Sequence, residues 1–441
     1  MAAMGQKRKS RTVCSGRDAG LQHGRKSILI QRPLAIDPAG PLPGVVVGTS
    51  TLHPLLYRKR VERCECAKPG DLVAIYGPGD ILTGYGLYNA RSEIAVRVLF
   101  PSVELPTEEQ WRQKLAAAVS LRRDLLKLDE MTDAYRVVHA EADGLSGLVV
   151  DRYGDVLSAE VFSLGMYQRA EAILALLSPL CGTRRTVVRT SPQFLSQEGY
   201  NPPPLASPDL PEQVTVQESG TRFRVRFASG HKTGFFCDQR ENRRRLAGFC
   251  AGRTVLDLCC YTGGFAVQAK KLGKAAEVTG VDLDEEPLQL ARENANLNQV
   301  RVRFVQSDVF LYMREMLQQG RQYDVVVLDP PKLIRNRAEL EEGTRKHFDL
   351  NRLAMRLVSP GGLLLSCCCS GLLQEADFVR LLCSASYQAG PVTEAASEER
   401  SARHAARPMQ ILARTGAAAD HPVAAGVPES EYLKAVWMRL G

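Results

Sequence analysis

The cysteines Cys367, Cys368 and Cys369 and the motif that begins at Asp329 and ends at Lys332 are the residues best suited to covalent chemistry. A thiolate can add to carbon 6 of a pyrimidine, and this addition makes carbon 5 nucleophilic enough to attack a methyl donor. The thiol must first ionise, from a pKa near 8.5, which a cation such as Lys332 could assist. Asp329 could hold cytosine through its ring nitrogen or amine and stabilise the intermediate.

Each of the three cysteines can also be interpreted as a small apolar residue that fills the end of a strand. Side chains alternate along a strand, so Cys367 and Cys369 should share one face while Cys368 takes the other. The reaction also needs a base that removes the proton from carbon 5. The sequence assigns no residue to that role.

A carboxylate also marks the end of an earlier apolar run. Val255 to Leu258 contains Asp257 and leads into Tyr-Thr-Gly-Gly and then an amphipathic stretch, a pattern typical of a buried strand, a tight turn and a helix start. Gly263 and Gly264 allow a close approach of backbone to a ligand, and the helix start offers free amides to anionic oxygens. We therefore predict a nucleotide-like cofactor at this turn.

Two further strands should end in acids. Residues 278–281 lead to Asp282, which could bind both ribose hydroxyls of an adenosine, and residues 302–305 lead to Asp308, which could accept the adenine amine. Neither G-x-G-x-x-G nor G-x-x-x-x-G-K-[ST] occurs. Three acids without a phosphate-binding lysine favour a cationic cofactor, and S-adenosylmethionine fits better than NAD.

The elements that must position these side chains form a doubly wound parallel sheet. The runs at 323–328 and 362–366 predict two more strands, which bring Asp329 and the cysteines to the same carboxyl edge as the cofactor. Residues 231–240 precede this fold and could close over the adenosine or the substrate. Asp238 and then Asn242 could cap a helix that carries residues 243–245. A helix that only packs on the domain is the alternative to a role at the site.

The length of 441 residues predicts about three domains. We expect a disordered basic tail at 1–25, a β-rich domain at 26–103, a small central α/β domain at 104–225 and the cofactor-binding α/β domain at 226–441. The net charge of +8 suits a polyanionic partner. His53, Tyr57 and Arg58 place an aromatic ring beside cations, which suits RNA, although a solvated basic turn is an equal alternative.

The chain contains 12 cysteines, but no secretory signal precedes them, and most lie in apolar runs. Cys64 and Cys66 lack the partners of a zinc site, so no metal is expected. No apolar stretch reaches the ~18 residues of a membrane span. These features predict a cytoplasmic protein with reduced thiols and no membrane partner.

The motifs at 257–265, 329–332 and 369–371, together with HKTGFFCDQR at 231–240 and the tail from Asp420 to Lys434, resemble the bacterial 23S rRNA 5-methylcytosine methyltransferases of the large-subunit methyltransferase I type. The resemblance covers nearly the whole chain. It implies an N-terminal PUA domain, a central α/β domain and a C-terminal Rossmann-like class I methyltransferase domain. It also implies that Cys369, followed by Ser-Gly, is the nucleophile.

The residues and the resemblance together give three sets of candidate site residues. The catalytic set is Cys369, Asp329 and Lys332. The cofactor-binding set is Asp257, Tyr261, Thr262, Gly263, Gly264, Phe265, Asp282, Leu283, Asp308, Val309, Asp329, Gln239 and Arg240. The substrate-binding set is His53, Tyr57, Arg58, Lys232, Pro330 and Pro331.

The expected activity is S-adenosylmethionine-dependent formation of 5-methylcytosine in RNA, most specifically 23S rRNA. Methylation of uracil carbon 5 or of an exocyclic amine remains open, although Lys332 stands where amine methyltransferases usually carry an aromatic residue. A non-catalytic RNA-binding or ribosome assembly protein is the alternative of a different class. The sequence does not decide whether the chain forms a homodimer.

Overall fold

A computed structural model describes residues 31–49, 53–227, 235–390 and 406–441. The chain divides into two compact units, and each is described separately. The first unit comprises Met1–Val214, Val225–Phe235 and Asp420–Ser430, and the second comprises Thr215–Arg224, Phe236–Ala419 and Glu431–Gly441. The domain limits expected from the sequence stay a prediction.

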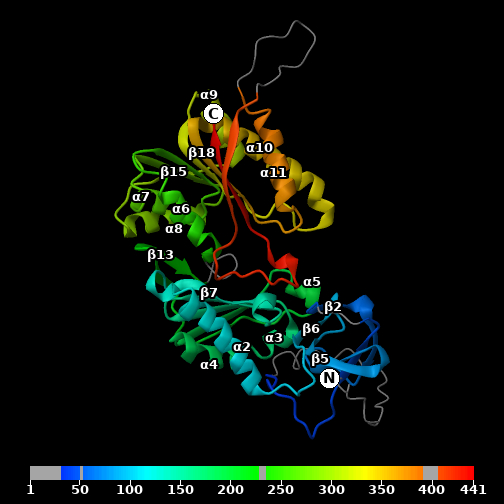
Figure 1. The fold of residues 1–441 in the computed structure, drawn as a ribbon. Coiled ribbons are helices and arrows are strands. Elements are labelled where there is room, and N and C mark those ends of the chain that lie inside the picture. The colour runs from blue at the N-terminus through cyan, green and yellow to red at the C-terminus, as the bar shows by residue number, and fades with distance from the viewer. Residues whose placement is uncertain (1–30, 50–52, 228–234, 391–405) are drawn as a thin grey trace, which may run out of the picture. The chain divides into compact units, whose positions relative to one another are not determined.

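A six-stranded sheet opens the first unit (Figure 1). Its strands are β1 Gly44–Val47, β2 Leu55–Tyr57, β3 Val61–Glu65, β4 Leu72–Gly77, β5 Ile81–Tyr88 and β6 Ile94–Phe100, in the order β2-β6-β5-β4-β1-β3. The apolar runs at 45–47, 71–76 and 94–99, separated by turn residues, predict strands that match β1, β4 and β6. A further run that predicts a strand, at 28–30, lies outside the described residues.

A five-stranded sheet with helices follows in the same unit. It has the order β11-β10-β9-β8-β7, and its elements are α2 Glu108–Ser120, β7 Ala134–His139, β8 Leu148–Tyr153, β9 Val156–Val161, α3 Leu164–Tyr167, α4 Ala170–Cys181, β10 Arg185–Thr190, α5 Phe194–Glu198 and β11 Leu205–Ala206. The two sheets and their helices share one apolar core. In this core Leu72 of β4 and Leu99 of β6 belong to the same cluster as Trp111 of α2 and Val150 of β8. The two modules therefore form one compact body.

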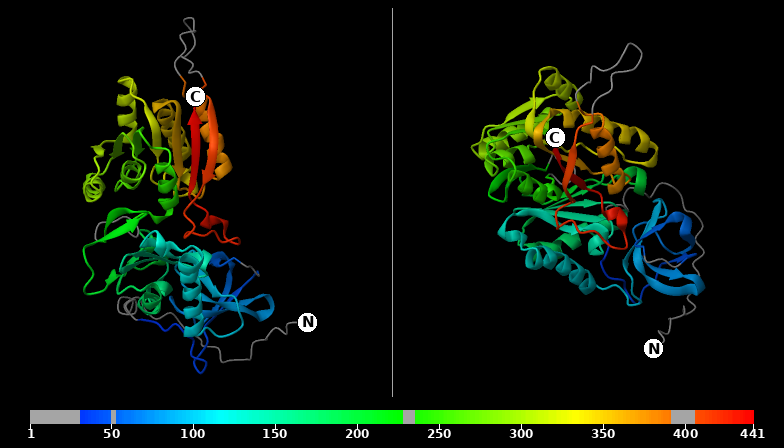
Figure 2. Two further views of the ribbon diagram at one scale, coloured as in Figure 1. Left: turned by 60° about the vertical axis from the view of Figure 1, so that its left-hand side comes forward. Right: turned by 45° about the horizontal axis from the view of Figure 1, so that its top comes forward.

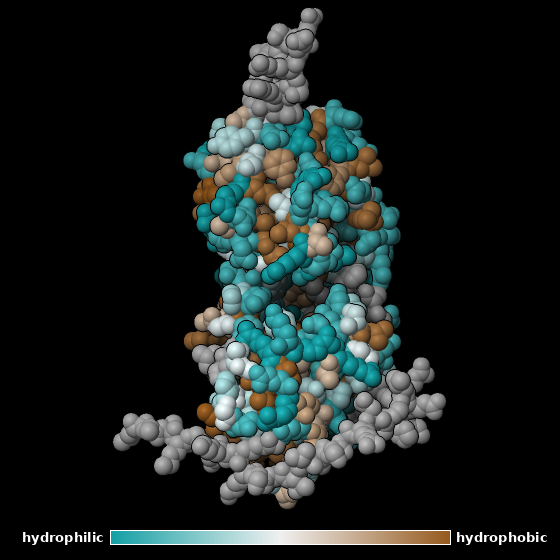
Figure 3. Space-filling view, turned by 90° about the vertical axis from the view of Figure 1, so that its right-hand side faces the viewer, coloured by the Kyte–Doolittle hydropathy of each residue, from teal (hydrophilic) through white to brown (hydrophobic). Residues whose placement is uncertain are grey.

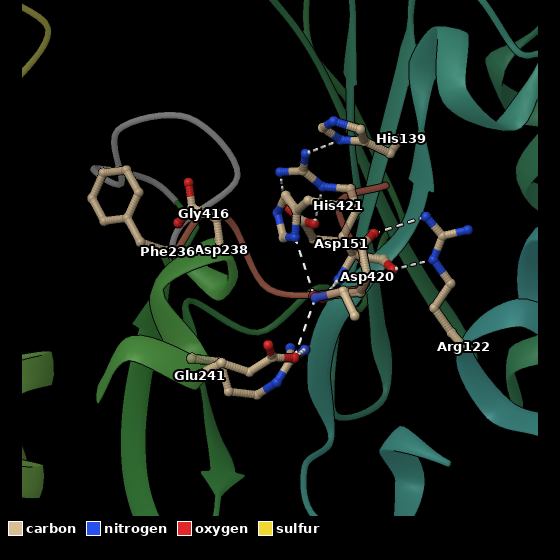
Figure 4. A network of polar contacts seen from close by, with 12 residues as sticks. Arg122, His139, Asp151, Phe236, Asp238, Glu241, Gly416, Asp420 and His421 are labelled. Carbon is tan, nitrogen blue, oxygen red and sulfur yellow. Dashed lines mark hydrogen bonds and ion pairs between the residues drawn. The ribbon is translucent and has the colours of Figure 1, made fainter. Parts of the chain in front are cut away.

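Residues Asp420–Ser430 belong to this first unit although they lie near the end of the chain. The Asp420 carboxylate accepts a hydrogen bond from the Arg136 amide at 2.8 Å, and its carbonyl accepts one from the Arg122 guanidinium at 2.8 Å. The His421 ring packs edge-on against His139, with 5.2 Å between ring centroids (Figure 4). Burial, reinforced by the Arg136 charge, lowers the pKa of His139 to about 2, so this imidazole is neutral.

The second unit contains a seven-stranded sheet in the order β16-β15-β14-β17-β18-β20-β19. Its strands are β14 Thr254–Leu258, β15 Glu277–Asp282, β16 Arg303–Gln306, β17 Tyr323–Leu328, β18 Val358–Cys368, β19 Met409–Thr415 and β20 Lys434–Leu440. β14 to β18 are parallel, while β20 is antiparallel to both β18 and β19. The order reverses at β14, so ligands are expected at the carboxyl ends of β14 and its neighbours.

Helices cover both faces of this sheet (Figures 1 and 2). They are α6 Arg240–Ala247, α7 Gly264–Lys271, α8 Glu285–Leu297, α9 Val309–Gln318, α10 Leu340–Leu357 and α11 Glu375–Ser386. Alternate strand residues supply two cores: Val325 and Val327 pack with α6 and α7, and Val326 and Leu328 pack with α9, α10 and α11. The central strands are buried on both faces, which explains their nearly continuous apolar sequences.

A hairpin of β12 Gln213–Glu218 and β13 Thr221–Arg226 leads into the second unit. Glu218 and Arg243 of α6 form a buried two-point ion pair, with contacts of 2.8 and 2.7 Å. The predicted capping of the next helix by Asp238 and Asn242 is wrong. A short 3-10 turn, Cys237–Gln239, precedes α6, which has no side-chain cap, and Asn242 lies inside the helix.

The described helices include none that is both long and apolar enough to cross a lipid bilayer. The face shown in Figure 3 is largely hydrophilic, with apolar residues interspersed.

Candidate functional site

The turn between β14 and α7 has a strained backbone. Cys259, Tyr261 and Gly263 all have positive φ values, of 61°, 49° and 78°, and only glycine adopts such angles without cost. A Cβ at Gly263 would lie 3.1 Å from both the Ala291 Cβ and the Phe304 Cζ atoms, so α8 and β16 pack directly on the turn. Glycine is therefore required here for both conformation and space.

Two of the predicted acids hold this turn in place. The Asp282 carboxylate accepts a hydrogen bond from the Tyr261 amide at 2.8 Å, and the Asp257 carboxylate accepts one from the Ala266 amide at 2.9 Å. Asp257 is fully buried, and burial raises its pKa well above the usual range. Asp282 is only partly buried, at the last position of β15.

The four predicted carboxylates converge on this turn. Burial raises the pKa of Cys259 well above its ordinary value, and the charges of Asp282, Asp329, Asp257 and Asp308 each raise it further. All four acids are thus close enough to act on a single thiol. A site with this charge favours a cation and disfavours phosphate groups.

Asp329 is held by a residue from the segment before the sheet. The Gln239 amide donates a hydrogen bond to the Asp329 carboxylate at 3.1 Å, and the Asn242 amide donates one to the Gln239 oxygen at 2.7 Å, which fixes the orientation of Gln239. The neighbouring Asp238 accepts a 2.7 Å hydrogen bond from the Tyr432 hydroxyl. The sequence predicted Gln239 at the site but missed Asn242 and Tyr432, because no local pattern connects them to the crevice.

The three cysteines at the end of β18 differ in exposure. Cys367 and Cys368 are fully buried, whereas Cys369, the first residue after the strand, is only partly buried. Cys367 and Cys369 pack on the face that α6 and α7 cover, and Cys368 packs in the opposite core, so the predicted alternation is confirmed. Burial raises the pKa of Cys367 well above its ordinary value, and the charge of Asp329 raises it further.

The other predicted cofactor contacts vary in exposure. Asp308 is exposed and caps α9 by accepting a 3.0 Å hydrogen bond from the Leu311 amide. Leu283 is exposed, Val309 is partly buried, and Thr262, Arg240 and Phe265 are buried, with Phe265 in the core beneath α7.

The predicted substrate contacts belong to both units of the chain. In the second unit Pro330 is buried, while Pro331 and Lys332 are exposed. In the first unit Tyr57 is exposed, Arg58 forms an ion pair with Glu93, and the His53 ring lies 3.6 Å from the Glu429 carboxylate. Lys232 lies outside the described residues. Among the described residues, no group of three or more His, Cys, Asp or Glu side chains could hold a metal ion.

Comparison with known proteins agrees with this geometry. Residues 195–387 match the family model of S-adenosylmethionine-dependent methyltransferases, and residues 50–100 match a PUA-like domain. A "Ribosomal RNA large subunit methyltransferase I" from Photobacterium profundum is 34% identical over 394 residues, which cover 87% of this chain and 94% of the relative. The chain belongs to this methyltransferase family. A protein of the same name from Tolumonas auensis is 36% identical, with 88% of this chain and 95% of the relative covered.

A solved structure shares the fold. The crystal structure of SMU.776 complexed with SAH superposes with a TM-score of 0.71 at 21% identity, covering 88% of this chain and 96% of the other. The cofactor of this methyltransferase family is S-adenosylmethionine. The residues of the turn fit such a cofactor, because the charges of four carboxylates act there and favour a positively charged sulfonium and amino group.

Proposed function

We propose that this methyltransferase forms 5-methylcytosine in 23S rRNA, with Cys369 as the covalent nucleophile. The relatives are named for large-subunit ribosomal RNA, and the PUA-like match together with the net charge of +8 supports an RNA substrate. The observation that carries the proposal is the exposure of Cys369. Of the three cysteines at the end of β18 it is the one that is partly exposed, and both it and Asp329 act electrostatically on the neighbouring thiol of Cys367.

In this mechanism the Cys369 thiolate adds to carbon 6 of the cytosine, and a bond forms between Sγ and that carbon. Asp329, held by Gln239, binds the ring nitrogen or the amine and stabilises the charge that develops on the ring. S-adenosylmethionine, when bound at the acidic turn, supplies the methyl group to carbon 5. Loss of the carbon 5 proton to a base then breaks the Sγ–C6 bond and frees the thiolate.

The test uses 23S rRNA transcripts that carry tritium at carbon 5 of cytosine. The wild-type enzyme should release the tritium during methylation, and RNA with 5-fluorocytosine should form a covalent adduct that migrates with the protein on a denaturing gel. Cys369→Ala should lose both signals while keeping S-adenosylmethionine affinity. The matched controls Cys367→Ala and Cys368→Ala remove buried thiols and should keep the covalent adduct.

The results separate the alternatives. Methylation with full tritium retention would indicate an exocyclic amine, and release only from labelled uracil would indicate uracil carbon 5. Binding of RNA without any methyl transfer would indicate an assembly protein. Activity of Cys369→Ala equal to that of wild type would remove the thiol from the mechanism.

A further inference from the structure

Lys434 is a buried cation next to the cysteine strand. It is the first residue of β20, where it pairs with Cys368 in the antiparallel register with β18. Its side chain is 3% exposed, and the ammonium donates a hydrogen bond to the carbonyl of Ser370. Burying an ammonium costs free energy unless the group is paired or hydrogen-bonded.

The carbonyl that Lys434 binds belongs to the turn that carries Cys369. Ser370 is itself buried, and its hydroxyl donates a hydrogen bond to the Ile334 carbonyl at 3.1 Å and accepts one from the Ile334 amide at 3.3 Å. This double contact joins the thiol-bearing turn to the segment that follows Asp329 and its prolines. Lys434 therefore holds the point where the two loops of the proposed active site meet.

The charges around this point come from several elements. The thiols of Cys368 and Cys369 and the carboxylates of Glu431 and Glu375 act on Lys434, and the Asp329 carboxylate acts on Cys367 and Cys368. His347 of α10 also faces Lys434, and burial lowers the pKa of its imidazole to about 4, so it is uncharged near neutrality. Lys434 thus interacts electrostatically with the thiols of Cys368 and Cys369, whereas Lys332 is exposed.

We propose that Lys434 is a positioning residue that fixes the Cys369 turn through the Ser370 carbonyl and places a positive charge beside the Cys369 thiolate. The inference rests on the proposed function of Cys369. Burial lowers the pKa of the Lys434 ammonium, and the charges of the neighbouring thiols and carboxylates act in the opposite direction. The thiol releases its proton to water, and no bond to Lys434 forms or breaks. Its charge opposes the Asp329 carboxylate, which would otherwise disfavour the thiolate.

The test measures thiol ionisation directly. The rate at which iodoacetamide alkylates Cys369 is followed by peptide mass spectrometry from pH 5 to 10, in the full-length protein without RNA. In wild type the midpoint should lie below 8.5, the ordinary value for cysteine. Lys434→Met and Lys434→Gln should shift it upward by about one pH unit, so that alkylation at pH 7 becomes about tenfold slower.

Two further variants separate charge from structure. Lys434→Arg keeps the positive charge, so its alkylation midpoint should lie close to that of wild type. Arg439→Met removes an exposed cation from the same strand, where Arg439 contacts Gln410, and should leave the midpoint unchanged. Retained S-adenosylmethionine binding shows that each variant is folded.

An unchanged midpoint in folded Lys434→Met would overturn the proposal, as would an equal shift in Arg439→Met. Should Lys434→Met not fold, the comparison of Lys434→Gln with Lys434→Arg decides, because the midpoint must follow the charge at this position. The assay reads the thiol and not methyl transfer. An active Cys369→Ala enzyme would therefore sink the proposed function without altering this result.

Discussion

Replacing Gly263 with alanine should destabilise the second unit through two separable effects. The backbone φ of 78° lies in the left-handed region, where a side chain costs about 1–2 kcal/mol. The new methyl group would also lie 3.1 Å from Ala291 and from Phe304, and such overpacking costs about 1–3 kcal/mol. The free energy of unfolding should therefore fall by about 2–5 kcal/mol.

Gly252→Ala is the matched control for the backbone effect. Gly252 belongs to the same unit and has a φ of 70°, but nothing lies within 4 Å of its added Cβ atom. It should lose only about 1–2 kcal/mol. The excess loss of stability in Gly263→Ala is then the cost of crowding at the turn between β14 and α7.

The assay is urea unfolding followed by tryptophan fluorescence. The sequence has 2 tryptophans, Trp111 in the first unit and Trp437 in the second, so a Trp111→Phe background leaves Trp437 as the reporter of the unit that contains both glycines. Calorimetry should show S-adenosylmethionine binding at least about tenfold weaker in Gly263→Ala and unchanged in Gly252→Ala, since only the first displaces the turn. Equal losses of stability in the two variants would refute the argument for close packing at Gly263.

Two further predictions concern Asp282 and His347. Asp282→Ala should weaken S-adenosylmethionine binding by about 1–3 kcal/mol, because a charged hydrogen-bond acceptor is lost. The control Asp284→Ala removes an exposed carboxylate and should leave the affinity unchanged. Equal calorimetric affinities for wild type and Asp282→Ala would exclude Asp282 from the site. Burial lowers the pKa of His347 in the folded protein to about 4, whereas the pKa in the unfolded chain is near 6.5. The neutral imidazole therefore contributes its full stability to the fold above pH 6.5, and this stability is lost as the pH falls toward 4. Wild type should lose about 3 kcal/mol more than His347→Phe between pH 7 and pH 4 in urea unfolding, and parallel stability curves would contradict the burial of a neutral imidazole.

The sheet of the second unit could be predicted because its strands are buried on both faces. Apolar runs such as 323–328 have few alternatives, and the prediction matched β17 from Tyr323 to Leu328. The acids that follow these runs could be placed for the same reason, since the end of a parallel strand fixes the edge on which the next residue lies. The positions of Asp282 and Asp329 at the ends of β15 and β17 therefore followed from the sequence, and their roles at the site stay predictions.

Residues joined only by tertiary structure could not be predicted. Tyr432 and Lys434 reach the site because the chain leaves the sheet after β18 and returns antiparallel as β20, and no local pattern announces that pairing. The Asn242 contact to Gln239 depends on a helix that begins at Arg240, so that Asn242 lies inside the helix and not at its cap. The left-handed conformation of Cys259 could not be predicted either, because cysteine rarely has a positive φ.

The methyl donor and the thiolate nucleophile of the proposed reaction require opposite electrostatic environments. A sulfonium donor is favoured by carboxylates, whereas a thiolate nucleophile is disfavoured by them, as the raised pKa of Cys259 among four acids illustrates. The order of the strands separates the two demands: β16, β15, β14 and β17 carry the acids, while the partly exposed thiol follows β18 and the buried ammonium begins β20. Removing the charge of Lys434 should therefore raise the pKa of the Cys369 thiol and leave the affinity for S-adenosylmethionine unchanged. If the acids surrounded both groups equally, the two effects would not separate.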